Sequence, residues 1–170
     1  MRLLRNLILG LIALVFLAVN LVLFQVDATQ SAIVTQFGRP VRAITAPGLY
    51  AKLPDPFQSV VRINNQLRVY NLPSTEFLTT DKKNIVVEAY ATWKVTDALT
   101  FLKTVRDPVG AETRLADVLA AELGVALGKV ELGRLVTVEA AQLKLPDTLA
   151  AVAQGAAGRT TQYGFAVTDV

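Results

Sequence analysis

The chain of 170 residues contains no cysteine and no histidine. Without cysteine it can form no disulfide, no thiolate nucleophile and no cysteine-ligated metal site. Without histidine it lacks the commonest general base and the commonest metal ligand. We therefore predict a protein that is not an enzyme, with no catalytic residue, no cofactor and no metal.

Short catalytic and phosphate-binding motifs are absent as well. The sequence has no GxGxxG, no GKS or GKT and no GxSxG. None of its three serines, Ser31, Ser59 and Ser74, lies in the sequence context of a nucleophile. The alternative within the enzyme class is a membrane-anchored hydrolase that uses a serine–lysine pair or two carboxylates. A protease assay on purified protein separates this alternative from a non-catalytic protein.

Charge is sparse and mixed in sign. The chain has 17 basic and 14 acidic residues, a net charge of +3, and its longest basic run is the pair Lys82-Lys83. A nucleic-acid interface requires a basic cluster or stripe, so we predict no nucleic-acid partner. The charged segment Asp81–Asn84 is interpreted as a solvated surface turn.

A long apolar run lies close to the N-terminus. Leu7–Phe24 is eighteen residues without a charge, and Asn20 is its one strongly polar side chain. As a helix it would be about 27 Å long, close to the roughly 30 Å of a bilayer's hydrocarbon core. We predict a transmembrane anchor over residues 7–26. The alternative is a signal peptide cleaved near Ala28.

The orientation of this anchor follows from the charges before it. Arg2 and Arg5 precede Leu7, and positive residues favour the cytoplasmic side. The sequence therefore predicts a short cytoplasmic tail over residues 1–6 and a single pass through the inner (plasma) membrane. The main domain lies on the periplasmic or extracytoplasmic side.

The segment after the anchor is predicted to be rich in strands. In Ile85–Val95 every odd position is apolar, whereas Glu88, Thr92 and Lys94 occupy even positions. Alternation with a period of two indicates a strand with one face on a core and one in water. Other strands are expected at residues 31–37, 41–44, 49–53, 59–64, 67–72 and 165–170.

Helical signals begin after this strand. Asp97 starts a short helix that reaches about Val105, and Asp107-Pro108 supplies an N-cap and a first-turn proline for a longer one. A third helix opens at Pro146-Asp147. The residues expected to face the core are Leu115, Val118, Leu119, Leu123, Ala126 and Leu127 in the long helix, and Leu149, Val152 and Ala156 in the last helix.

The order of elements predicts an α+β fold with a mostly antiparallel sheet and packed helices. We divide the domain into a β-rich first half, residues 27–95, and an α/β second half, residues 96–170. Gly124 and Gly128 are expected to mark a helix end or a tight contact with the sheet.

Four segments together resemble a known family. They are VTQFGRP at 34–40, APGLYAKLPDPFQSV at 46–60, LTTDKKNIVVEAYATWKV at 78–95 and YGFAVTDV at 163–170. With the N-terminal anchor, this combination resembles the SPFH (band 7) family of stomatins, prohibitins, flotillins and HflK/C. The short N-terminal tail makes the chain most similar to the HflC branch. The resemblance covers essentially the whole chain.

The resemblance implies a membrane-anchored scaffold rather than a catalyst. Such proteins assemble with an HflK-like paralogue into hetero-oligomeric rings or cages on the bilayer that modulate an FtsH-like AAA+ membrane protease. The family's C-terminal coiled-coil helix has no counterpart in this chain, which stops at Val170. The alternative within the family is a stomatin- or prohibitin-like organiser of membrane microdomains, or a regulator of lipids or channels.

Some apolar residues of the first strands and turns are candidates for contact with lipid or with a neighbouring subunit. They are Phe37, Leu49, Tyr50 and Phe57. The alternative is that these side chains fill the core of the domain.

Overall fold

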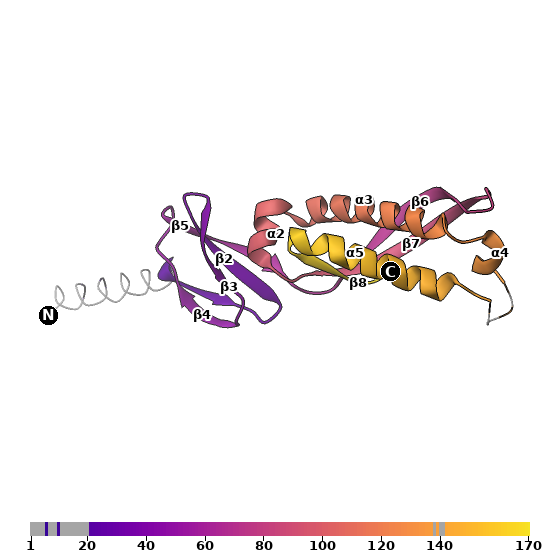
Figure 1. Ribbon diagram of the computed structural model, residues 1–170. Helices are drawn as coiled ribbons and strands as arrows, with labels where there is room; N and C mark the ends of the chain where they lie inside the picture. The colour runs from indigo at the N-terminus through magenta and orange to yellow at the C-terminus, as the bar shows by residue number, and fades with distance from the viewer. Residues whose placement is uncertain (1–5, 7–9, 11–20, 138, 140–141) are drawn as a thin grey trace. The chain divides into compact units, whose positions relative to one another are not determined.

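The computed structural model describes residues 6, 10, 21–137, 139 and 142–170 (Figure 1). The chain divides into two compact units, Met1–Asn65 and Gln66–Val170. This boundary differs from the predicted one after residue 95. It lies earlier because β6 (Arg68–Leu78) and β7 (Asn84–Val95) form one sheet with the C-terminal strand β8 (Phe165–Asp169). The two long strands therefore belong with the helices.

The described part of the first unit is built from two small antiparallel sheets, with strand orders β1–β4 and β3–β2–β5. The strands are β1 (Leu23–Val26), β2 (Gln30–Gln36), β3 (Arg39–Ile44), β4 (Gly48–Ala51) and β5 (Gln58–Asn64). Buried side chains from both sheets form one core, which consists of Phe24, Val26, Ala32, Val34 and Ile44 with Tyr50 and Val60 packed against it. Alternate residues of these short strands thus point between the sheets.

The predicted anchor ends too late in the sequence. β1 begins at Leu23 and pairs with β4, so that Phe24 lies opposite Tyr50. Phe24 and Val26 are buried in the core of the first unit. Because a strand takes up these residues, they are not part of a membrane helix, and the prediction for Phe24 and for 23–26 is wrong.

Arg2 and Arg5 of the predicted tail, and residues 7–9 and 11–20 of the predicted anchor, lie outside the described residues. Across residues 6, 10, 21–137, 139 and 142–170, no helix is both long and apolar enough to cross a bilayer.

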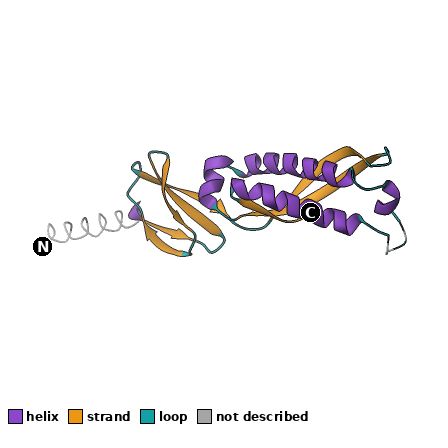
Figure 2. Cartoon of the chain, viewed as in Figure 1, coloured by secondary structure: helices purple, strands orange, loops and turns teal. Residues whose placement is uncertain are grey.

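The second unit packs helices on one face of the antiparallel sheet β6–β7–β8 (Figure 2). The helices are α2 (Ala98–Thr104), α3 (Pro108–Leu127), α4 (Leu132–Leu135) and α5 (Leu145–Thr160), and a 3₁₀ turn, η1 (Thr161–Tyr163), precedes β8. α3 and α5 contact each other along the sheet. Mixed α+β structure with antiparallel sheets, as the sequence predicts, is confirmed.

Trp93 is the centre of the second unit's core. It is fully buried on β7, and its ring lies edge-on to Phe165 at 5.4 Å between centroids and stacks on Phe101 at 6.4 Å. Edge-on aromatic pairs stabilise a core beyond their buried area. The alternation predicted for β7 holds along the strand, with odd positions buried or half-buried and even positions mostly exposed.

The predicted N-cap at Asp107 is present, and Asp97, where the short helix is predicted to start, caps α2 as well. The Asp97 side chain accepts hydrogen bonds from the backbone N–H groups of Leu99 and Thr100, and Asp107 accepts one from Gly110 N at 2.7 Å. α3 presents a stripe of fully buried side chains at four-residue spacing: Ala111, Leu115, Leu119, Leu123 and Leu127. The helix ends at Gly128, as expected.

Two elements differ in extent from the prediction. β6 continues past Leu72 to Leu78 because a register shift between Leu72 and Thr75 accommodates Pro73, which cannot donate to the sheet. In α5 the fully buried face is Thr148, Val152, Ala156 and Thr160, and Leu149 is only half-buried.

Candidate functional site

A tight turn between β2 and β3 forms one end of the first unit. Its two residues, Phe37 and Gly38, have φ values of +50° and +79°. A two-residue hairpin turn with positive φ at both positions matches the twist of the strands and normally carries Asn or Gly. Phenylalanine at φ +50° is a strained choice, of order 1–2 kcal/mol. The turn nevertheless holds an aromatic side chain that is 73% exposed.

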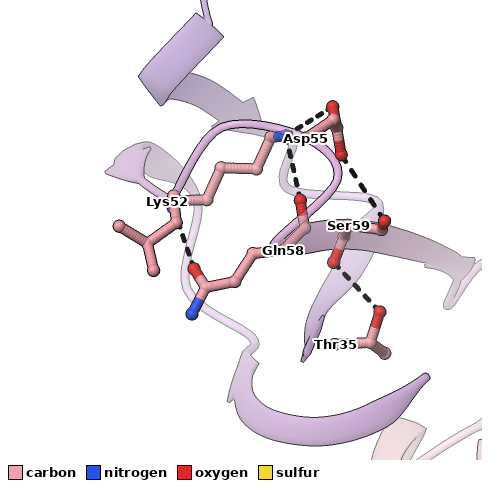
Figure 3. A network of polar contacts seen from close by, with 6 residues as sticks. Thr35, Lys52, Asp55, Gln58 and Ser59 are labelled. Atoms are coloured by element: carbon pink, nitrogen blue, oxygen red, sulfur yellow. Dashed lines mark hydrogen bonds and ion pairs between the residues drawn. The ribbon is translucent and has the colours of Figure 1, made fainter. Parts of the chain in front are cut away.

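A second turn, residues 52–57, lies at the same end and is held by polar contacts (Figure 3). Lys52 Nζ forms an ion pair with Asp55 Oδ2 at 2.8 Å and donates to the Gln58 carbonyl at 3.2 Å. Leu53 N donates to Gln58 Oε1 at 2.9 Å. The hydrogen bond and charge of Lys52 hold the pKa of the Asp55 carboxyl below its usual value. These contacts give the turn a defined shape.

The same network reaches the neighbouring strand. Ser59 Oγ donates to Asp55 Oδ1 at 3.5 Å, and Thr35 Oγ1 donates to the Ser59 carbonyl at 3.2 Å (Figure 3). The turn is therefore tied to β2 and β5, the strands that lead to the hairpin tip.

The two turns bring a pair of exposed aromatic rings together. Phe37 and Phe57 lie edge-to-face, with ring centroids 6.5 Å apart and planes at 80°. Phe57 is 54% exposed, and Leu53 beside it on the turn is also exposed. Side chains of this size that remain in water are a candidate contact surface. We call Phe37, Leu53 and Phe57 the apolar tip.

The apolar tip lies at the end of the first unit where the N-terminal segment arrives. Lys52 N donates to the Val22 carbonyl at 2.8 Å, and β1 starts at the next residue. Lys52 is in turn bonded to Gln58, which directly follows Phe57. The end of the apolar run, at Val22, therefore lies beside the turn, residues 52–57, that carries Leu53 and Phe57 of the apolar tip.

The four predicted contact residues divide between surface and core. Phe37, Leu49 and Phe57 are exposed, Leu49 by 66%. Tyr50 is half-buried; its ring packs 6.1 Å from that of Phe24, and its hydroxyl donates to the Ala46 carbonyl at 3.0 Å. The alternative of a core position holds for Tyr50. Leu53 was missed because the sequence places it at the end of a predicted strand, 49–53, whereas β4 ends at Ala51 and leaves Leu53 on the exposed turn.

The second unit contains a cleft of about 760 Å³ between α3, α4 and α5. Its lining mixes apolar side chains with charges of both signs, among them Lys129, Arg134 and Asp147. Glu122 lies at one side, largely covered, and its Oε1 forms an ion pair with Arg159 Nε at 2.7 Å. The described residues contain no group of three or more His, Cys, Asp or Glu side chains positioned to bind a metal.

The charged turn between β6 and β7 is more organised than the sequence indicates. Asp81 Oδ1 accepts hydrogen bonds from Thr79 Oγ1 at 2.6 Å and from Leu132 N at 3.2 Å, and Oδ2 pairs with Lys83 at 3.0 Å. These bonds, the one from Thr79 foremost, hold the pKa of Asp81 far below its usual value. Thr80 Oγ1 donates to the Gly128 carbonyl at 2.6 Å. All four residues of Asp81–Asn84 are exposed, as the sequence predicts, and the turn also ties the sheet to the end of α3 and the start of α4.

Comparison with known proteins assigns the family. The family model described as "SPFH domain / Band 7 family" matches residues 24–170. The chain belongs to the SPFH/band 7 family. The match begins at Phe24, in β1, so it covers residues 24–65 of the first unit and the whole of the second unit.

A curated relative of the SPFH/band 7 chain is the protein HflC of Vibrio cholerae serotype O1. The two are 26% identical over 132 residues, which cover 71% of this chain and 40% of that protein. The matched region thus spans less than half the length of HflC.

Proposed function

We propose that the chain is a membrane-anchored, non-catalytic scaffold subunit of the HflC type. In this proposal it assembles with an HflK-like paralogue into a ring or cage that modulates an FtsH-like AAA+ protease. The observation that carries it is the family match over residues 24–170 together with the similarity to HflC. Confinement to the plane of a membrane raises the local concentration of subunits and so favours lateral assembly.

The first unit supports an attachment close to the bilayer. The apolar run predicted to cross the membrane meets the fold at Val22, beside the turn that carries Leu53 and Phe57. Phe37 is exposed at a strained backbone position. An exposed phenylalanine gains nothing there that offsets the strain unless its ring makes a contact. We propose that the apolar tip, with Leu49 as a further exposed residue, contacts lipid or a neighbouring subunit.

Purification of the tagged full-length gene product from its native membranes in mild detergent tests the assembly. The proposal predicts that mass spectrometry finds an HflK-like and an FtsH-like protein in the complex, and that imaging shows a closed ring or cage. A lone monomer recovered under conditions that keep other membrane complexes intact would refute it.

The N-terminal sequence of the mature protein tests the anchor. An uncleaved anchor predicts Met1 or the residue after it, with Arg2 and Arg5 on the cytoplasmic side. A mature chain that starts near Ala28 would show that residues 1–27 are a signal peptide and would remove the proposed attachment.

A further inference from the structure

The first unit has more positive charge than its own carboxylates neutralise. Residues 21–65 contain four basic side chains, Arg39, Arg42, Lys52 and Arg62, and two acidic ones, Asp27 and Asp55. Lys52 is neutralised by Asp55 at 2.8 Å. Within the described part of the chain, none of the three arginines forms an ion pair with a carboxylate. All three are exposed.

The strand register places all three arginines on one face of the sheet, with Arg62 opposite Ala32. Arg39 lies opposite Gln36 and Arg42 opposite Val34, and these β2 residues are two positions apart. Residues directly opposite each other in an antiparallel pair project to the same side. The Arg42 guanidinium lies over the Tyr50 ring at 5.7 Å and is therefore already engaged. Among the described residues, no aromatic ring lies beneath the guanidinium of Arg39, which is nearest the turn.

Arg39 lies directly behind the apolar tip, at the start of β3. It is the first residue of β3 and pairs with Gln36, the residue before Phe37, so it is set back from the two-residue turn by about one residue, or roughly 3.4 Å along the strand. Apolar side chains that enter a bilayer interface are buried roughly 5–10 Å into the boundary between headgroups and acyl chains. With the Phe37 ring buried there, Arg39 is close enough behind the turn for its long side chain to reach the lipid phosphates. Phe37 and Arg39 also line the same shallow hollow at the hairpin tip.

We infer that Arg39 binds anionic phospholipid headgroups and so gives the apolar tip a preference for negatively charged membranes. The inference rests on the proposed contact of this tip with lipid. A guanidinium donates two parallel hydrogen bonds to a phosphate, and its weak hydration suits an interface. One basic residue close to an anionic surface strengthens attachment about five-fold at moderate ionic strength.

The absence of cysteine from the native chain allows a direct test. The full chain carrying Leu53→Cys is labelled with a nitroxide and reconstituted in nanodiscs. One set contains phosphatidylcholine alone, and the other contains about 30% phosphatidylglycerol. Immersion is measured from the accessibility of the label to oxygen and to a water-soluble relaxation agent. A label at Val109→Cys, an exposed position in the second unit, is the reference for a label in water.

The inference predicts that the immersed fraction at residue 53 rises with phosphatidylglycerol. Arg39→Gln lowers the ratio of immersed to solvent-exposed label about five-fold in those discs, and added salt has a similar effect. Arg62→Gln is the matched control, because Arg62 is equally unpaired but lies opposite Ala32, four residues along β2 from Gln36. It leaves the ratio unchanged.

The outcomes distinguish the inferred lipid preference of Arg39 from the proposed membrane contact of the apolar tip. Equal immersion in the two lipid compositions, or equal effects of the two arginine substitutions, would overturn the lipid preference while leaving the contact in place. A label that stays in water in both compositions would overturn the membrane contact of the tip as well.

Discussion

The contact between α3 and α5 depends on a glycine. A Cβ atom at Gly155 would lie 2.7 Å from Cδ of Glu122 and closer still to Oε2. Normal contacts of this kind are longer than about 3.4 Å. The Glu122 carboxylate therefore occupies the space that the missing side chain leaves, and from there it pairs with Arg159 at 2.7 Å. Gly158, one turn further on in the same helix, has open space around its Cα.

The two glycines should respond differently to alanine. Gly158→Ala is expected to stabilise the second unit by about 0.5–1 kcal/mol, because alanine is the better helix former. Gly155→Ala gains the same amount from the helix but displaces the carboxylate from its covered position. The lost ion pair is worth about 0.5–1 kcal/mol, since Arg159 is more than half exposed. We therefore expect Gly155→Ala to be close to neutral.

A double-mutant cycle makes this expectation sharp. In a Glu122→Ala background, Gly155→Ala should stabilise as much as Gly158→Ala, so Glu122 and Gly155 couple by about 0.5–1 kcal/mol. Glu122 and Gly158 should not couple. Urea unfolding of the full chain in detergent micelles measures these values through the fluorescence of Trp93, the only tryptophan, which is buried in the second unit. A Gly155→Ala variant as stabilised as Gly158→Ala with Glu122 intact would refute the reasoning.

Two further substitutions test the second unit. Asp81 has a folded-state pKa below its usual 3.8, so its contribution to stability is present above that pH and is lost as the pH falls through the lowered value. Urea unfolding should show Asp81→Asn to be less stable than the native chain at pH 7, with the difference shrinking between pH 4 and pH 2. A difference that is constant with pH would assign the loss to the amide's packing instead. Leu119→Ala, at a fully buried position of α3, should cost about 2–5 kcal/mol. The exposed Val109→Ala should change stability by less than about 0.5 kcal/mol, and similar losses at both sites would contradict the assignment of the buried face.

Local signals in the sequence predict most elements of the fold. The alternation along β7 predicts its length within a residue, and Asp107-Pro108 predicts the start of α3 because capping chemistry is local. Pairing over long distances in the sequence is not predictable in this way. The register of β8 on β7 joins Phe165 to Val95. Because of that pairing, the boundary between the units lies after residue 65 and not after residue 95. No local sequence signal near either residue indicates this boundary.

The candidate surface is predicted only in part, for a related reason. Apolar composition alone does not decide whether a side chain in a short strand points outward. Leu49 and Tyr50 are neighbours on β4 and face opposite ways, so one is exposed and the other packs on Phe24. Phe37 owes its exposure to the positive φ of a turn. The unpaired state of Arg39 depends on where the few carboxylates lie in space, which only the structure provides.

Hydropathy also misplaces the end of the predicted membrane anchor, and the reason bears on function. A core strand and a membrane helix draw on the same residue types, so hydropathy does not distinguish residues 23–26, which form β1, from the apolar residues before them. The described residues Leu21 and Val22 are helical, and β1 follows with no loop between them. A helix that continues directly into a buried strand has no flexible linker to absorb reorientation. If residues 7–22 cross the bilayer, the backbone bond from Lys52 to Val22 keeps the turn that carries Leu53 and Phe57 beside the point of exit. In that case β1, the strand that hydropathy alone does not reveal, would hold the apolar tip at the membrane surface.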